Sequence, residues 1–186
     1  EILLHPAFPE REFNIYCQKR KQSLTIERQK VDMQSREMFA EALFGSNHPY
    51  GISTPEEAYD DLTTDDLREH YDGLYTAENS FVVCSGNIDD RVYNHIADLA
   101  SELRTGTSID IKFPKPTTTH YLERNIDSAL QSSVRVGRLL FPRTHPDFVG
   151  MQVVAAILGG YFGSRLMQNL REEHGYTYGV MAAMVN

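Results

Sequence analysis

The longest pattern in the chain covers residues 10–44, which contain no glycine or proline and in which less polar residues recur at helical spacing. The pattern predicts one long helix or two in tandem, with the weakest point in the polar run 27–35. Turn-forming residues between Gly45 and Gly51 end it. The recurring positions, at steps of four and seven, are Phe13, Cys17, Leu24, Val31, Met38 and Ala42.

Two further helices are predicted by the residues that would cap their N-termini. Thr63 followed three residues later by Asp66 is typical of a capping box, in which side chain and backbone exchange hydrogen bonds. Asp89 can accept a hydrogen bond at the start of the second helix. Each helix is expected to pack an apolar face against a core. The residues of this face are Leu67, Tyr71, Leu74 and Tyr75 in the first helix and Val92, Ile96, Leu99 and Leu103 in the second.

Short apolar runs predict strands between these helices. Residues 81–84 form a compact run bounded by turn residues, which suits a buried strand. Other candidates lie at residues 121–122, 132–141 and 176–181, and a helix is predicted over residues 146–158. Helices that alternate with such strands predict an α+β fold, with the helices packed on a mostly antiparallel sheet in each of two domains.

The boundary between the two domains is predicted in residues 105–119, which contain Gly106, Pro114 and Pro116 and show no periodicity, as expected of a linker. Residues 1–104 would then be the C-terminal part of a first domain, and residues 120–186 the truncated N-terminal part of a second. Because the last residues form a strand pattern that stops without a turn, we expect a fragment that self-associates through an open sheet edge.

Composition narrows the classes of partner. Apolar residues make up 41% and charged residues 24% of the chain, as in ordinary soluble globular proteins, and no apolar run is long enough to span a bilayer. The net charge of −8 repels phosphate backbones, so no nucleic acid is expected as a partner. The two cysteines, Cys17 and Cys84, lie in a predicted helix and a predicted strand and are interpreted as buried thiols.

The seven histidines do not predict a metal site. Zinc peptidases place two histidines three or four residues apart on one helical face, and no histidine of this chain has a second one at that distance. His48, which precedes Pro49, is interpreted as a turn residue. We therefore predict no metal ligand in this chain.

Residues 159–165 suggest a phosphate-binding loop at a helix N-terminus because they contain three glycines and Ser164. They lack the Lys-Ser/Thr pair of a P-loop and do not follow a predicted strand. A tight turn between two helices, with Ser164 capping the second, is the preferred interpretation.

Arg171 and Tyr178 are the candidate functional residues. Arg171 lies in the last turn of a predicted helix, Gly175 reverses the chain, and Tyr178 stands near the start of a predicted strand, so both side chains could reach one point. Arginine offers a planar fork of donors and tyrosine a single hydroxyl. The alternative is that Arg171 stabilises the helix C-terminus and Tyr178 packs in the core.

Two blocks of residues resemble the insulinase (pitrilysin) family of zinc peptidases. Together they align nearly the whole chain with that family. The first comprises residues 41–45 and 48–51, then Leu62, Thr63, Leu67, Tyr71, Tyr75, Asn79, Val82 and Gly86. The second, which is the more specific, comprises residues 157–160, 163–166 and 170–173, then Gly175 and Tyr178.

The resemblance implies a molecule of two halves, each built from two similar α+β domains, that close around a chamber. The zinc site would lie in the opposing half or partner subunit, and a peptide or unfolded protein would be the substrate. Arg171 and Tyr178 match the family's substrate-binding pair, with Tyr178 also catalytic through a hydrogen bond to the transition state. A fragment or non-zinc half of this kind would be inactive alone, with no cofactor in this chain. The alternative is a catalytically inactive structural or binding subunit of the same fold.

One departure from the family pattern supports the non-zinc assignment. Active members carry a glutamate as third zinc ligand on the long helix, and ungapped counting places Ser23 at that position. Glu27 lies one turn away and would serve only in a different alignment. The resemblance therefore favours the half that does not hold the metal.

Overall fold

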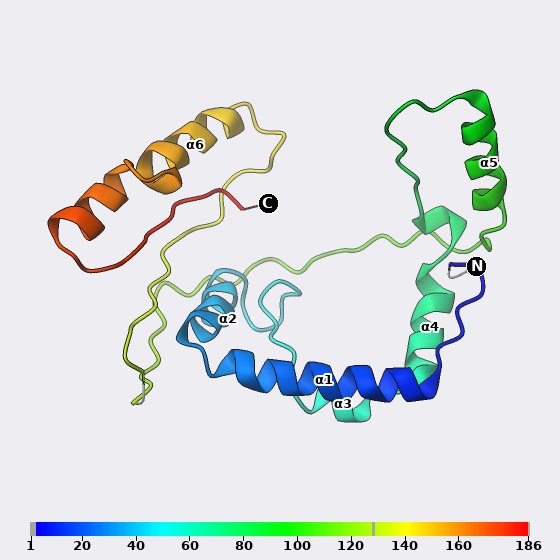
Figure 1. The fold of residues 1–186 in the computed structure, drawn as a ribbon, viewed down its shortest axis with the longest axis horizontal. Coiled ribbons are helices and arrows are strands. Elements are labelled where there is room, and N and C mark those ends of the chain that lie inside the picture. The colour runs from blue at the N-terminus through cyan, green and yellow to red at the C-terminus, as the bar shows by residue number, and fades with distance from the viewer. Residues whose placement is uncertain (1–2, 128, 186) are drawn as a thin grey trace. The chain divides into compact units, whose positions relative to one another are not determined.

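Two compact units make up the chain in the computed structural model, which describes residues 3–127 and 129–185. Unit 1 is Glu1–Val136 and unit 2 is Gly137–Asn186. The predicted domain limits, 1–104 and 120–186 with a linker between them, remain a prediction. In unit 1 the helices are α1 (Glu10–Arg28), α2 (Val31–Phe44), α3 (Ala58–Asp61), α4 (Thr64–Leu74), η1 (Ala77–Asn79) and α5 (Asp90–Ser101). Unit 2 contains α6 (Phe148–Ala155), η2 (Ala156–Gly160) and η3 (Met167–Glu173) (Figure 1).

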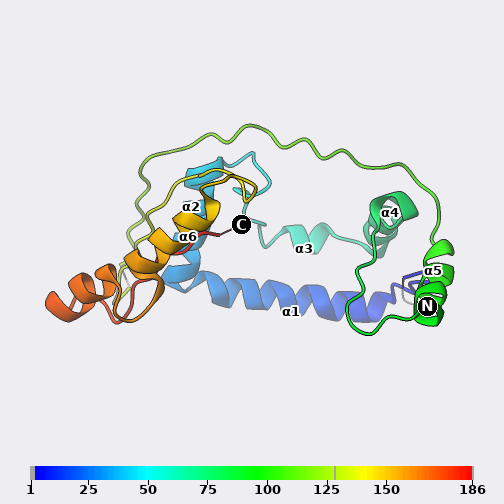
Figure 2. The ribbon, with the colours of Figure 1, turned by 90° about the horizontal axis from the view of Figure 1, so that it is seen from above.

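The predicted helix over residues 10–44 is two helices in tandem. Helix α1 ends at Arg28 and α2 begins at Val31, so the break falls within the polar run that was expected to be weakest. Lys30, with extended backbone angles, precedes α2 and redirects the chain. Helix α1 contacts both α2 and α3, and α3 lies along α1 in both views (Figures 1 and 2).

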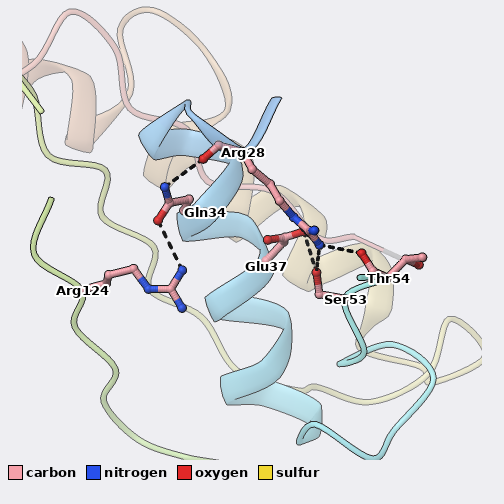
Figure 3. Close-up of polar contacts among 6 residues, drawn as sticks. All are labelled: Arg28, Gln34, Glu37, Ser53, Thr54 and Arg124. Atoms are coloured by element: carbon pink, nitrogen blue, oxygen red, sulfur yellow. Dashed lines mark hydrogen bonds and ion pairs between the residues drawn. The ribbon is translucent and has the colours of Figure 1, made fainter. Parts of the chain in front are cut away.

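A polar network holds the junction of α1 and α2 (Figure 3). One Glu37 carboxylate oxygen accepts hydrogen bonds from Arg28 Nε at 3.2 Å, Arg28 Nη2 at 3.0 Å and Ser53 Oγ at 2.6 Å. Arg28 Nη2 also donates to the Thr54 carbonyl at 2.7 Å. Burial alone raises the pKa of Glu37, but the hydrogen bonds from Ser53 and Arg28 and the charges of Arg28 and Arg124 outweigh it, so the pKa lies below its usual range.

The C-terminal end of α2 is capped by the segment predicted as a linker. A helix leaves its last carbonyls without partners inside the helix. Here Thr117 N–H donates to the Phe44 carbonyl at 3.0 Å, and Thr119 N–H donates to the Ala42 carbonyl at 2.7 Å. Phe113 from the same segment stacks on His48, with ring centroids 5.9 Å apart. This part of the segment is therefore docked on unit 1.

His48 is a buried turn residue, as interpreted from the sequence. Its Nδ1 accepts a hydrogen bond from the Tyr50 N–H at 3.1 Å, which closes the turn after α2. The Phe44 ring stacks on the imidazole with centroids 5.0 Å apart. Its hydrogen bond and its packing thus give His48 a structural role.

The predicted helix caps are confirmed at α4 and α5. Thr63 and Asp66 form the capping box, in which Asp66 N–H donates to Thr63 Oγ1 at 3.2 Å and Thr63 N–H donates to Asp66 Oδ2 at 2.7 Å. Asp89 Oδ1 accepts from the Val92 N–H at 2.8 Å, and α5 follows it directly. Local hydrogen bonding therefore fixes both helix starts.

The predicted fold class is wrong for this structure. None of the residues in 3–127 and 129–185 forms a β-strand, so the expected α+β arrangement of helices on a mostly antiparallel sheet is absent there. The strand candidates at 81–84, 132–141 and 176–181 are irregular connections (Figure 1). A strand requires the N–H and C=O groups of a neighbour, which an apolar run cannot supply by itself. Phe81 at 87% exposure and Val136 at 94% show that these runs reach no core face.

The cysteine prediction is correct for one residue. Cys17 is buried on α1, as expected. Cys84 is exposed, contrary to its interpretation as a buried thiol, because residues 81–84 do not enter a sheet.

Within the described part of the chain, no helix combines the length and the apolar character needed to cross a bilayer.

Candidate functional site

Unit 2 places the two candidate residues on either side of a chain reversal. Arg171 lies in the last turn of η3, a helix of the wider π type. Gly175, with φ of +63°, then turns the chain back, in the left-handed region that glycine adopts without strain. Gly175 N–H donates to the Arg171 carbonyl at 3.1 Å and Tyr176 N–H to the Leu170 carbonyl at 2.9 Å. The predicted end of this helix at Gly175 is therefore confirmed.

The segment that follows returns along the helices that precede η3 (Figure 1). Ala182 N–H donates to the Gly159 carbonyl at 3.2 Å. A Cβ atom on Gly159 would lie 2.5 Å from the Ala182 nitrogen, so the close approach requires glycine at this position. Val180 N–H is 3.5 Å from the Met167 sulfur, so the returning segment contacts η3 as well as η2.

Arg171 is already engaged within unit 2. Its guanidinium carbon lies 4.6 Å from the centroid of the Phe162 ring, in cation–π geometry. Its Nε lies 3.6 Å from a carboxylate oxygen of Glu172. The Arg171 side chain is 33% exposed, so the guanidinium lies at the surface against an aromatic face.

Tyr178 is 91% exposed and its ring does not pack in a core, which argues against the core-packing alternative. Local hydrogen bonds hold the backbone on either side of Tyr178, because Thr177 Oγ1 donates to the Gly179 carbonyl at 2.8 Å and accepts from the Gly179 N–H at 3.2 Å. Among the described residues no hydrogen bond or ion pair joins Arg171 to Tyr178. Their convergence on one point therefore stays a prediction.

An open apolar pocket of about 410 Å³ lies beside these residues. Its walls combine the glycine-rich end of η2, the start of η3 and the returning segment. No local pattern of residues could have predicted this pocket, because its walls come together only when the chain folds back at Gly175. The side chains that line it are Tyr161, Phe162, Met167, Val180 and Met181.

The glycine-rich residues 159–165 form the interhelical turn preferred from the sequence. Ser164 N–H donates to the Tyr161 carbonyl at 3.1 Å, and Gln168 N–H donates to the Ser164 carbonyl at 2.9 Å. The Ser164 hydroxyl is fully buried and has no hydrogen-bond partner among the described residues, so its predicted role as side-chain cap is wrong.

The described residues do not fit a zinc site. No group of three or more His, Cys, Asp or Glu side chains within 3–127 and 129–185 is placed to hold a metal ion. Ser23, at the position of the family's third ligand, donates a hydrogen bond to Glu27 Oε1 at 2.9 Å, and Arg20 Nη1 is 3.5 Å from the same oxygen. Glu27 is thus paired within α1.

The chain is similar to known proteins in both sequence and fold. A family model described as "Peptidase M16 inactive domain" matches residues 61–186, more than half of the chain. The Bacillus subtilis (strain 168) protein described as "Uncharacterized zinc protease YmxG" is 25% identical over 188 residues, which cover 97% of this chain and 44% of that protein. A crystal structure of a peptidase M16 inactive domain from Pseudomonas fluorescens matches with a TM-score of 0.74 at 22% identity, over 96% of this chain and 44% of that one. At this identity the likeness concerns the fold alone, and the chain spans less than half the length of either relative.

Proposed function

We propose that this chain, which belongs to the family of peptidase M16 inactive domains, holds peptide substrate for an opposing zinc-bearing half. The resemblance to zinc peptidases of the insulinase type is confirmed, since the family model matches their inactive domain and the bacterial relative is described as a zinc protease. The chain accordingly corresponds to the part of such proteases that the family model describes as inactive. The finer assignment, to particular contacts with substrate, rests on the geometry of unit 2.

The observation that carries this proposal is the position of Phe162. This ring both lines the apolar pocket and has the Arg171 guanidinium carbon over its face, so a cation with a planar fork of donors lies next to an apolar recess. An extended peptide presents the complementary groups, because its main-chain carbonyls can accept hydrogen bonds from the cation and its apolar side chains can enter the recess. Arg171 would bind a substrate carbonyl or terminal carboxylate while the pocket takes an adjacent apolar side chain.

Tyr178 would act at the reacting carbonyl. Its exposed side chain leaves the hydroxyl available to a ligand. A hydroxyl that donates to charge developing only in the transition state lowers the barrier without tightening ground-state binding. On this proposal Tyr178 is catalytic and substrate-binding, whereas Arg171 binds substrate.

The metal chemistry would belong to the opposing half, because the described side chains of this chain do not fit a zinc site. The substrate would be a peptide or unfolded protein enclosed between the two halves. This chain would supply substrate binding and the transition-state hydrogen bond from Tyr178, and would not cleave peptides by itself.

The test uses the intact protease with a fluorogenic peptide. Tyr178→Phe keeps the ring but removes one donor, so kcat should fall about 100-fold with KM little changed. Arg171→Ala should raise KM more than it lowers kcat, and Arg171→Lys should rescue poorly because an ammonium lacks the bidentate fork. Turnover that is unaltered in both Tyr178→Phe and Arg171→Ala would refute the assignment.

A structural or binding role without catalysis is the second candidate. It is favoured by the contacts that Arg171 already makes with Phe162 and Glu172, which would suit a residue that only stabilises unit 2. In that case Arg171→Ala should lower the melting temperature and leave the kinetics per folded molecule unchanged. The same variants therefore separate the two functions.

A further inference from the structure

We propose that Phe162 is a positioning residue that orients the Arg171 guanidinium for substrate, an inference that rests on the proposed function. The Arg171 guanidinium carbon lies over the face of the Phe162 ring, 4.6 Å from its centroid. Phe162 lies in the turn that leads into η3, and Arg171 lies in the last turn of η3. Phe162 would then act through Arg171 as well as line the pocket.

The turn gives the Phe162 ring a fixed base. Tyr161 and Ser164, which flank it, are joined by a backbone hydrogen bond of 3.1 Å, and Ser164 is fully buried. A Cβ atom on Gly163 would lie 3.1 Å from the Tyr161 ring, so the turn is closely packed on that side as well. The ring itself is 67% exposed and offers its face to the cation at the surface.

Stacking restrains the arginine without occupying its donors. A ring beneath the guanidinium plane fixes the orientation of that plane and leaves the N–H groups at its edge pointing outwards. The ion-pair contact to Glu172 is made through Nε. Within the described residues, Nη1 and Nη2 of Arg171 donate no hydrogen bond, so the outer fork is available. An arginine held in this way loses less side-chain entropy when a carbonyl or carboxylate binds.

The experiment is a double-mutant cycle in the intact protease, with KM and kcat measured on one peptide. Phe162→Leu removes the aromatic face and keeps an apolar side chain in the pocket. It should raise KM about two- to fivefold, the range expected for loss of an exposed cation–π contact, with a smaller change in kcat. Phe162→Tyr keeps the aromatic face and should restore KM. In an Arg171→Ala background, Phe162→Leu should have no further effect on KM.

Three outcomes would overturn the proposal: the same rise in KM in both backgrounds, no rise in either, or equal impairment by Phe162→Tyr and Phe162→Leu. The first would mean that Phe162 contacts substrate directly or only maintains the pocket. If Phe162→Leu does not fold, Phe162→Met replaces it in the cycle. Tyr93→Leu, at an exposed ring on α5, controls for loss of a surface aromatic.

The cycle also separates this inference from the function on which it rests. A normal KM in Arg171→Ala would remove the proposed role of Arg171 and this inference with it. A raised KM in Arg171→Ala with a normal KM in Phe162→Leu would leave the role of Arg171 intact and refute the positioning role alone.

Discussion

Replacing Glu37 with glutamine should destabilise unit 1 more than any change to an exposed ion pair in it. Glu37→Gln keeps the size of the side chain and removes the charge that pairs with Arg28. The carboxylate oxygen accepts three hydrogen bonds, and both side chains of the pair are only 23% exposed. Charge-assisted hydrogen bonds at such partly buried sites contribute more than surface pairs, so the free energy of unfolding should fall by about 1.5–2.5 kcal/mol at pH 7.

The contribution of Glu37 to the free energy of unfolding should depend on pH. The pKa of Glu37 is lower in the folded chain than in the unfolded chain, where a glutamate has a pKa of about 4.3. Its stabilising contribution is therefore fully present above about pH 4.3, and is lost as the pH falls through the lower folded pKa. The difference between wild type and Glu37→Gln should be large at pH 7 and should shrink below about pH 4.

The assay is urea unfolding followed by the helical circular-dichroism signal, since the chain contains no tryptophan. Arg68→Gln is the matched control, because Arg68 pairs with Asp65 at 2.8 Å but both side chains are largely exposed. That change should cost less than about 0.5 kcal/mol. Equal losses in Glu37→Gln and Arg68→Gln, or a Glu37→Gln difference that persists unchanged at low pH, would refute the reasoning.

Two further predictions concern the purified chain. It should bind no stoichiometric zinc and cleave no peptide, because its described residues form no metal-binding group; elemental analysis that finds about one zinc per chain, or chelator-sensitive cleavage, would contradict this. It should also self-associate at high concentration, because Phe81, Val134, Val136 and Leu130 are more than 80% exposed on segments without regular structure; a strictly monomeric species in light scattering would count against this expectation.

The features that could be predicted from the sequence are those that depend on neighbours in the chain. The Thr63–Asp66 capping box and the Asp89 cap are contacts over three residues, and the left-handed turn at Gly175 depends on one residue type. The break between α1 and α2 also follows from local polarity. Strands could not be predicted in the same way, because their hydrogen bonds require a partner that a local apolar run does not specify.

In the candidate site, too, the local features could be predicted from the sequence and the tertiary contacts could not. Arg171 was correctly expected in the last turn of its helix, a local property. Its contact with Phe162 and the pocket beside it depend on how a turn and a returning segment pack, which no spacing rule gives. Tyr178 was interpreted as either a core residue or a site residue, and its high exposure removes the first possibility but does not by itself establish the second.

The glycines that suggested a phosphate-binding loop have a different physical role, which favours binding of an apolar group over binding of an anion. Gly159 is required because the Ala182 backbone crosses it at a distance that leaves no room for a Cβ atom. That crossing brings Val180 and Met181 over the end of η2 and closes one wall of the pocket. The absence of a side chain at Gly159 therefore allows an apolar recess to form, with Phe162 as the wall that contacts Arg171. A substitution of Gly159 should act on peptide binding through the pocket, whereas a loop that bound phosphate would show its loss in anion affinity.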